Sequence, residues 1–243
     1  MSRRSQLACA WIGGLSVVGL AIGFFLVTGY VPPPRANLSA PQLAHFYVTH
    51  RTRLRVGLLI TFIAFGGWGP LVALVSVQMW RIEGRRPVLA LLQTLAGGAG
   101  WIFLLLPVML LAIATFRAGA VSPETTQTLH DLGWITAFMA IVPFIVQLLS
   151  IAGAIFQDRS ATPVFPRWVG YFNVWAAISF APGGLLIFFK SGPFSYQGLF
   201  VFWVPFIVFG AWIAIMAWAA GRAAAADRPE ALAKVVGVSA IAA

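Results

Sequence analysis

The sequence predicts an all-α integral membrane protein, a bundle of six transmembrane helices with short surface helices in the exterior loops. Six apolar stretches of roughly 22 to 29 residues contain no Lys, Arg, Asp, Glu or His, and each is long enough to cross a ~30 Å hydrocarbon core. Charged residues make up only 9% of the chain, whereas soluble domains average about 25%. A helix also satisfies its own backbone hydrogen bonds, which lipid cannot do.

The expected spans are residues 7–30, 56–80, 88–116, 133–156, 168–189 and 199–221. Residues 1–221 therefore form one transmembrane domain, and residues 222–243 are expected to be a short, flexible cytoplasmic tail. The first apolar run has about 24 residues and exceeds the 7 to 15 of a secretory signal, which predicts a retained helix. Gly19 and Gly23 within it have the small-xxx-small spacing that lets a second helix approach closely.

Two connections on the predicted exterior side carry helix-start signals. Ser39 and Gln42 have the spacing of a capping box, in which each side chain bonds the other residue's backbone. Ser122, followed by Pro123 and Glu124, is a favourable N-cap before a proline and an acidic first turn. We expect a short helix in each of these loops, either lying at the membrane surface or running into the next span.

Helix breakers interrupt several spans near their middles. The prolines and the glycine pair predict kinks, which either adjust helix packing or line a transport path. The positions are Gly66, Gly67, Pro107, Pro143, Pro182 and Pro205.

The basic residues predict the orientation. Of the 16 Lys and Arg residues, ten lie on the side of the two termini and six on the other side. Because cytoplasmic loops are enriched in Lys and Arg, both termini are predicted to be cytoplasmic. The predominance of arginine over lysine, with abundant alanine, is typical of a bacterial inner (plasma) membrane protein. Clustering of these charges at span ends argues against a nucleic-acid partner.

The histidines lie on the predicted exterior side and are the candidate metal ligands. His45, His50 and His130 would bind a metal ion if they converged with Asp131 or Glu124. The five-residue spacing of His45 and His50 argues against this, because ligands on one helical face are three or four residues apart. We therefore expect neither a metal nor a cofactor. A separate alternative makes His130 and Asp131 the acid/base pair of a lipid-modifying enzyme.

Arg51, Arg55 and Lys190 are candidate ligands for lipid headgroups or another anion. Arg51 and Arg55 are four residues apart and share a helical face, whereas Arg53 lies on another. Guanidinium groups match phosphate oxygens, but basic side chains at helix ends also extend to the interface without binding a specific anion. Arg167 and Trp168 are predicted to anchor the fifth span at the membrane interface.

Four polar residues inside the spans are candidates for interhelical hydrogen bonds or for the lining of a solute path: Gln93, Gln147, Ser150 and Asn173. Gln147 and Ser150 lie on one helical stripe, which should face protein, and Gln93 and Asn173 are expected to meet that stripe. No span contains an ionisable residue, which argues against a proton-coupled carrier.

Three segments resemble those of a group of uncharacterised bacterial multi-pass integral membrane proteins with about six helices. They are Asp131–Trp134, Phe165–Trp175 and Ser191–Phe194, and the similarity extends over about residues 45–212. The group has no assigned activity, so the resemblance implies only that these stretches act together.

The sequence thus predicts a non-catalytic inner-membrane protein, either an accessory or scaffold subunit or a binder of lipids or apolar molecules. Its expected partners are membrane lipids or another membrane-protein subunit. Its expected working surface is an exterior cap made of residues 35–55, 117–132 and 190–198. One alternative is a small permease for an apolar or amphipathic solute, and a second is the lipid-modifying enzyme.

Overall fold

The computed structural model describes residues 2–226, and this part of the chain is a helical bundle without strands. Six helices in it are long and apolar enough to cross a membrane, which confirms the all-α, multi-pass architecture. They are Arg3–Val27, Arg51–Glu83, Val88–Phe116, Pro123–Gln157, Arg167–Phe188 and Leu199–Ala226. We refer to them as spans one to six.

Several spans are built from consecutive helical segments. Their components, in chain order, are α1 (Arg3–Leu20) with the π-helix η1 (Ala21–Val27); α3 (Arg51–Ala64), η2 (Phe65–Gly67) and α4 (Trp68–Glu83); α5 (Val88–Phe116); α6 (Pro123–Met139) and α7 (Ile141–Gln157); α8 (Arg167–Phe180) with η3 (Ala181–Phe188); and η4 (Leu199–Trp203) with α9 (Val204–Ala226). The helix α2 (Ala40–Thr49) lies outside the spans.

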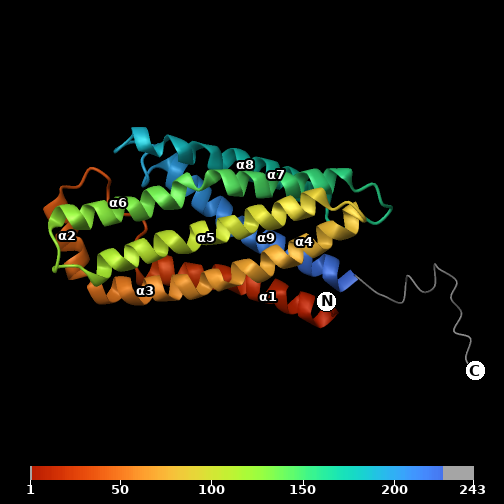
Figure 1. The fold of residues 1–243 in the computed structure, drawn as a ribbon, viewed down its shortest axis with the longest axis horizontal. Coiled ribbons are helices and arrows are strands. Elements are labelled where there is room, and N and C mark those ends of the chain that lie inside the picture. Colours follow the sequence, from red (N-terminus) through yellow and green to blue (C-terminus); the bar gives the residue numbers. More distant parts are fainter. Residues whose placement is uncertain (1, 227–243) are drawn as a thin grey trace, which may run out of the picture.

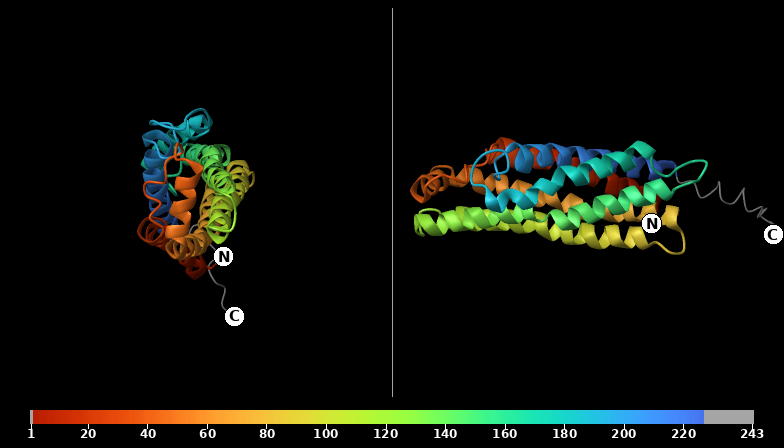
Figure 2. Two further views of the ribbon diagram at one scale, coloured as in Figure 1. Left: turned by 90° about the vertical axis from the view of Figure 1, so that its left-hand side faces the viewer. Right: turned by 90° about the horizontal axis from the view of Figure 1, so that it is seen from above.

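The six spans run side by side along the long axis of the molecule (Figure 1). Helix α2 lies at one end, here called the α2 end, and α1 begins and α9 ends at the opposite end. Each span packs against the next, and α9 packs back onto α1. The bundle is therefore a closed ring, as the two views in Figure 2 show.

Both predicted helix starts are present. Ser39 and Gln42 form the capping box at the beginning of α2. The Ser122 side chain accepts a hydrogen bond from the backbone N–H of Thr125 at the beginning of α6. These contacts satisfy amide groups that a first helical turn leaves without partners.

Most of the predicted breaks coincide with a change of helix type. Gly66 and Gly67 both lie in the 3-10 segment η2, and Pro182 lies in the 3-10 segment η3. The fourth span is interrupted at Ala140, three residues before Pro143. Pro205 is the second residue of α9, which follows the π-helical η4, whereas α5 continues through Pro107. A proline has no N–H to donate to the preceding turn, which explains local rewinding at three of these sites.

The glycine pair of span one has the predicted packing role. A Cβ atom at Gly19 would lie 2.8 Å from the Cβ of Ala64. At Gly23 it would lie 2.7 Å from the Thr61 hydroxyl and 2.9 Å from the Gly57 carbonyl. Span one therefore contacts α3 almost backbone to backbone.

Several predicted boundaries differ from the structure by three or more residues, among them the start of span two, at Arg51 rather than at residue 56. Span four begins at Pro123 rather than near Gly133, because the capped helix α6 runs without a break into the apolar stretch. Helix α9 continues to Ala226, so the first residues of the expected tail belong to span six. The rest of that tail, residues 227–243, lies outside the described residues.

Candidate ligand-binding cavity

A cavity of about 320 Å³ lies inside the ring of helices. This is within the range of small-molecule sites in proteins, about 300–1,000 Å³. Every span contributes to its wall, for example through Leu20, Phe65, Val108, Phe138, Phe180 and Phe206. The cavity therefore exists only because all six spans close around it.

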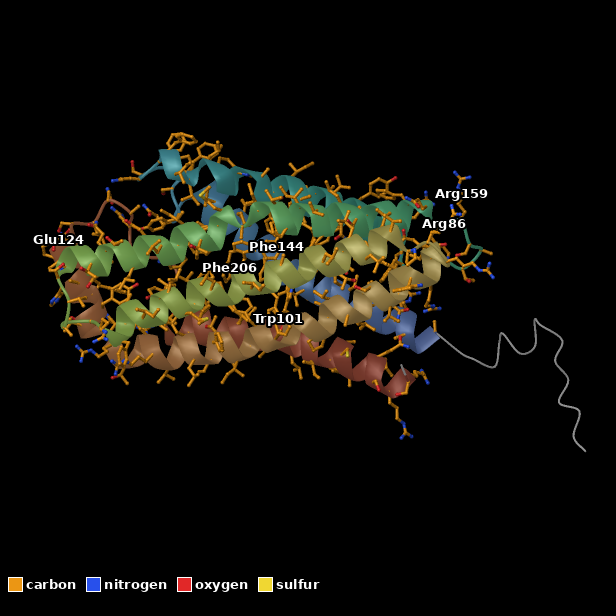
Figure 3. The ribbon with its side chains drawn as sticks, in the orientation of Figure 1. Arg86, Trp101, Glu124, Phe144, Arg159 and Phe206 are labelled. Carbon is orange, nitrogen blue, oxygen red and sulfur yellow. The ribbon has the colours of Figure 1, made fainter. Side chains whose placement is uncertain are left out.

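The cavity occupies the middle of the bundle. Figure 3 shows Phe144 and Phe206, two of its lining residues, midway between Glu124 at one end and Arg86 at the other. On α5 the wall extends from Phe103 to Leu111, which corresponds to about 12 Å at the helical rise of 1.5 Å per residue. The cavity is elongated enough for a short length of hydrocarbon chain.

Aromatic side chains close the cavity toward the α2 end. Trp134 stacks on Tyr196 with ring centroids 6.0 Å apart and meets the edge of Phe202 at 6.1 Å. Trp134 also stacks on Phe138, which lines the same wall. Offset and edge-to-face pairs of this kind add about 0.5–1.5 kcal/mol each beyond their burial.

A second aromatic group lies beneath the cavity, toward the opposite end. Trp68 stacks on Phe209 with ring centroids 5.5 Å apart and packs against Trp212 at 5.3 Å. The indole N–H of Trp68 donates a 2.9 Å hydrogen bond to the Gly97 carbonyl, which fixes the ring. The cavity is thus bounded at both ends by packed rings.

The cavity wall is almost entirely apolar. Thr61 has the only side-chain hydroxyl in it, and this group already donates to the Gly57 carbonyl at 2.8 Å. Trp134 is 2% exposed, and its indole N–H has no hydrogen-bond partner within the described residues. A wall of this kind favours a hydrocarbon and disfavours any charged group.

The cavity reaches the lipid-facing surface at one seam. Of its lining residues, two are exposed: Ala21 at the start of η1 and Ile207 on α9, whose side chain is 65% exposed. Phe25 of η1 contacts Phe206 of α9 edge to face, with centroids 4.6 Å apart. This aromatic pair partly closes the seam between spans one and six.

A buried hydrogen-bonded chain lies between the cavity and α2. The Tyr30 hydroxyl donates to the Tyr47 hydroxyl at 3.1 Å, and Tyr47 lies 2.8 Å from Nδ1 of His130. Burial raises the pKa of both tyrosines, so both stay protonated. Because Tyr47 accepts from Tyr30, its own proton is available to Nδ1 of His130. The imidazole proton then lies on Nε2. Sequence reasoning missed both tyrosines, because they are brought to His130 from separate segments.

His130 and Asp131 form hydrogen bonds with different tyrosines. His130 is fully buried beside Tyr47, whereas Asp131 accepts a 3.3 Å hydrogen bond from the Tyr196 hydroxyl. The Tyr196 ring also contacts His130, with ring centroids 5.8 Å apart. Burial, followed by the nearby charge of Asp131, raises the pKa of Tyr196. The acid/base pair therefore stays a prediction.

The other histidines lie apart from His130. Nε2 of His45 lies 3.4 Å from the Thr49 hydroxyl, and Nδ1 of His50 lies 2.9 Å from the Phe46 carbonyl. Within residues 2–226, no group of three or more His, Cys, Asp or Glu side chains is arranged to hold a metal ion.

The three arginines at the start of span two contact the carbonyl ends of neighbouring helices. Arg51 donates to the Ala118 carbonyl and Arg55 to the Phe116 carbonyl at the end of α5. Arg53 donates to the carbonyls of Val27 and Leu26 at the end of η1. This confirms that Arg51 and Arg55 share a face and that Arg53 lies on another. Cations stabilise the negative end of a helix dipole.

Lys190, the third predicted anion ligand, lies across the same end of the molecule. It is exposed, and its charge acts on Asp131 of α6, whereas Arg51 and Arg55 donate to carbonyls at and just after the end of α5. The predicted set of Arg51, Arg55 and Lys190 thus does not share one site.

The polar residues inside the spans form hydrogen bonds and do not line the cavity. Gln93 accepts from the Ser76 hydroxyl of α4, and Asn173 accepts from the indole N–H of Trp212 at 2.9 Å. Ser150 donates to the Val146 carbonyl, and the side-chain amide nitrogen of Gln147 has no partner. The stripe through Gln147 and Ser150 is buried as predicted, but Gln93 and Asn173 bond to other helices.

The predicted anchor at the start of α8 lies at the end opposite α2. Trp168 is half exposed and stacks on Trp218 of α9 with centroids 5.9 Å apart, and Arg222 lies over the Trp218 ring at 5.8 Å. Arg167 acts electrostatically on Asp158. An exposed aromatic and basic pair of this kind suits a membrane interface.

A polar network at this end was not predicted. The Gln78 side chain donates to Gln6 of α1 at 2.6 Å and accepts from Arg81, which also donates to the Ala223 carbonyl of α9. The Glu83 carboxylate accepts from two backbone N–H groups in the first turn of α5, at 2.9 and 2.7 Å. These residues fix the helix ends and form no opening.

No protein-family model matches the chain, and no curated protein or solved structure is significantly similar to it.

Proposed function

We propose that this multi-pass membrane protein is non-catalytic and binds one apolar molecule, the hydrocarbon part of a lipid or a similar compound, in its central cavity. The observation that carries the proposal is the cavity itself: about 320 Å³ enclosed by all six spans, with a wall that presents rings and aliphatic groups. Ligand sites are typically concave and mostly apolar with a few polar groups.

Binding fits this geometry better than permeation. A solute path needs access from both sides of the membrane, whereas packed rings bound the cavity at both ends, around Trp134 and Trp68. The residues expected to line a path, such as Gln93 and Asn173, are engaged in hydrogen bonds away from the cavity. Nor does the enzyme alternative gain support, since His130 and Asp131 have different partners.

The proposal includes the setting of the protein. We place it in the inner membrane of a bacterium with both termini cytoplasmic, on the distribution of Lys and Arg. Its partners would be membrane lipids, with a second membrane-protein subunit as the alternative and without nucleic acid. Its membership of the bacterial group named above stays a prediction, as does an accessory or scaffold role.

The test is photolabelling with a small apolar carbene precursor, 3-trifluoromethyl-3-phenyldiazirine, on protein purified in mild detergent. We expect mass spectrometry to find label on the lining residues Trp134 and Phe138. The variant Ala137→Phe places a ring in the cavity and should reduce this labelling several-fold.

The matched control is Met139→Phe, which adds a ring to the exposed face of the same helix. It should leave labelling of Trp134 and Phe138 unchanged. The proposal is wrong if Met139 and other exposed residues are labelled in the natural protein while the lining residues are not. It is also wrong if Ala137→Phe leaves labelling of the lining residues intact in a folded protein.

A further inference from the structure

The seam between spans one and six has features that distinguish it from the other helix contacts. Both exposed residues of the cavity wall, Ala21 and Ile207, lie there. A Cβ atom built on Gly210, another lining residue, would meet no atom within 4 Å. The cavity and the lipid-facing surface are therefore separated at this seam by little more than the Phe25 and Phe206 rings.

The helices that flank the seam are wound irregularly. Span one changes from α-helix to π-helix at Ala21, and span six begins with the π-helix η4 before Pro205. Short π-helical segments occur frequently at functional sites, because the extra residue per turn redirects side chains. Both irregular segments lie on the half of the seam nearer the α2 end (Figure 1).

A charged group from α3 lies at the end of η1, one of the two helices that flank the seam. Arg53 is exposed and its guanidinium group donates to the carbonyls of Val27 and Leu26, at the end of η1. Ala21 lies six residues before Val27, which places it about 9 Å further into the membrane at the helical rise of 1.5 Å per residue. Arginine pairs well with phosphate oxygens. A phosphate at Arg53 would thus stand one short length of chain above the opening.

On the basis of the proposed function, we infer that a bilayer phospholipid loads the cavity sideways, with one acyl chain passing between η1 and α9 and its phosphate at Arg53. The chain meets an apolar wall from Ala21 inward. The second chain stays in the bilayer, beside the exposed Ile22 and Leu26. This assigns the headgroup contact to Arg53, which binds η1, and not to Arg51 and Arg55, which bind the end of α5.

The experiment uses the full chain in phosphatidylcholine liposomes that contain a trace of phosphatidylglycerol with a diazirine in one acyl chain. After illumination, we expect label on the cavity residues Val108 and Phe138. Ala21→Phe should abolish that labelling by filling the seam. The control, Ile22→Phe, changes an exposed neighbour outside the cavity wall and should have no effect.

The headgroup contact is tested in the same liposomes. Arg53→Gln should lower cavity labelling about fivefold, since one basic residue contributes about 1 kcal/mol at an anionic lipid surface. Arg53→Lys should retain part of it. Arg55→Gln removes an exposed arginine with a similar carbonyl contact and should change nothing. A diazirine-bearing diacylglycerol lacks the phosphate. It should label the cavity of the natural protein only weakly, to the same extent as phosphatidylglycerol labels Arg53→Gln.

The outcomes separate this inference from the proposed function. If the small apolar probe labels the cavity but the phospholipid does not, the binding function stands and phospholipid loading is wrong. If phospholipid labelling persists in Ala21→Phe, the chain enters elsewhere. The phosphate contact is wrong if two results occur together. Phosphatidylglycerol would label the cavity of Arg53→Gln as strongly as that of the natural protein, and diacylglycerol would label the natural protein equally strongly.

Discussion

At the residue scale, close contacts between helices and buried hydrogen bonds stabilise this bundle. Without a hydrophobic driving force between helices in lipid, association depends on van der Waals packing and interhelical hydrogen bonds. The glycines of span one provide the packing, with Gly23 placed against Thr61 and Gly57. The hydrogen bond from Trp212 to Asn173 joins span six to span five.

Gly23→Ala should destabilise the protein. The added Cβ would lie 2.8 Å from the backbone nitrogen of Thr61, so one helix must move away from the other. Overpacking of this kind costs about 1–3 kcal/mol. The measurement is thermal unfolding in detergent, where a lower midpoint is expected. Gly98→Ala is the control, because a Cβ there meets no atom within 4 Å and the midpoint should not fall.

Asn173→Leu and Trp212→Phe together should destabilise the protein less than the sum of their separate effects. Asn173→Leu alone leaves the buried indole N–H of Trp212 without an acceptor, at a cost of about 1–3 kcal/mol. Removing the donor as well eliminates that cost. A double-mutant cycle on unfolding midpoints gives the coupling between the pair. Strictly additive effects would show that the hydrogen bond contributes nothing.

At the element scale, the sequence was sufficient to predict the spans but not the contacts among their buried side chains. Runs without charges predicted all six helices, since each charge in lipid is costly. The helix start at Ser122 was predicted, but the span was expected to begin about ten residues later, because polar residues such as His130 and Asp131 lie within the continuous helix α6. Their partners Tyr47 and Tyr196 come from distant segments, and sequence spacing carries no signal of such meetings. The cavity likewise depends on incomplete packing among side chains from six helices.

The connection between α7 and α8 should become less stable at acidic pH. Burial disfavours the charged form of Asp158, but hydrogen bonds from Ser160 and Val164, with the charge of Arg167, hold its pKa below the usual value. The ionised carboxylate therefore stabilises the loop above a pH of about 4, and this contribution is lost as the pH falls through the folded-state pKa. Hydrogen exchange of residues 157–167 should accelerate on acidification.

The variant Asp158→Asn identifies the source of that effect. Its amide cannot accept at both positions, so the backbone N–H of Val164 loses its partner. Exchange in the loop should already be fast at pH 7 and should respond little to acid. An unchanged acid response in this variant would mean that another group controls the loop.

At the scale of the whole molecule, the ends of the bundle define two sides of a membrane. Glu124 lies at the α2 end, whereas Arg86 and Arg159 lie together at the other end (Figure 3). An alkaline phosphatase fusion after Glu124 should be active, and fusions after Arg86 or Arg159 should be inactive, if the termini are cytoplasmic. The opposite pattern would invert the proposed orientation, although the fold and the cavity would stay as described.

The closed ring of helices also determines when the cavity arises. Spans are inserted in chain order, and the last of them, which begins at Leu199, packs against the first. Until synthesis reaches that point, the inner face of α1 has only part of its protein neighbours and is exposed to bilayer lipid. Under the proposed binding function, chain completion would enclose apolar material that already occupies that face, and assembly would be the first occasion on which a ligand enters.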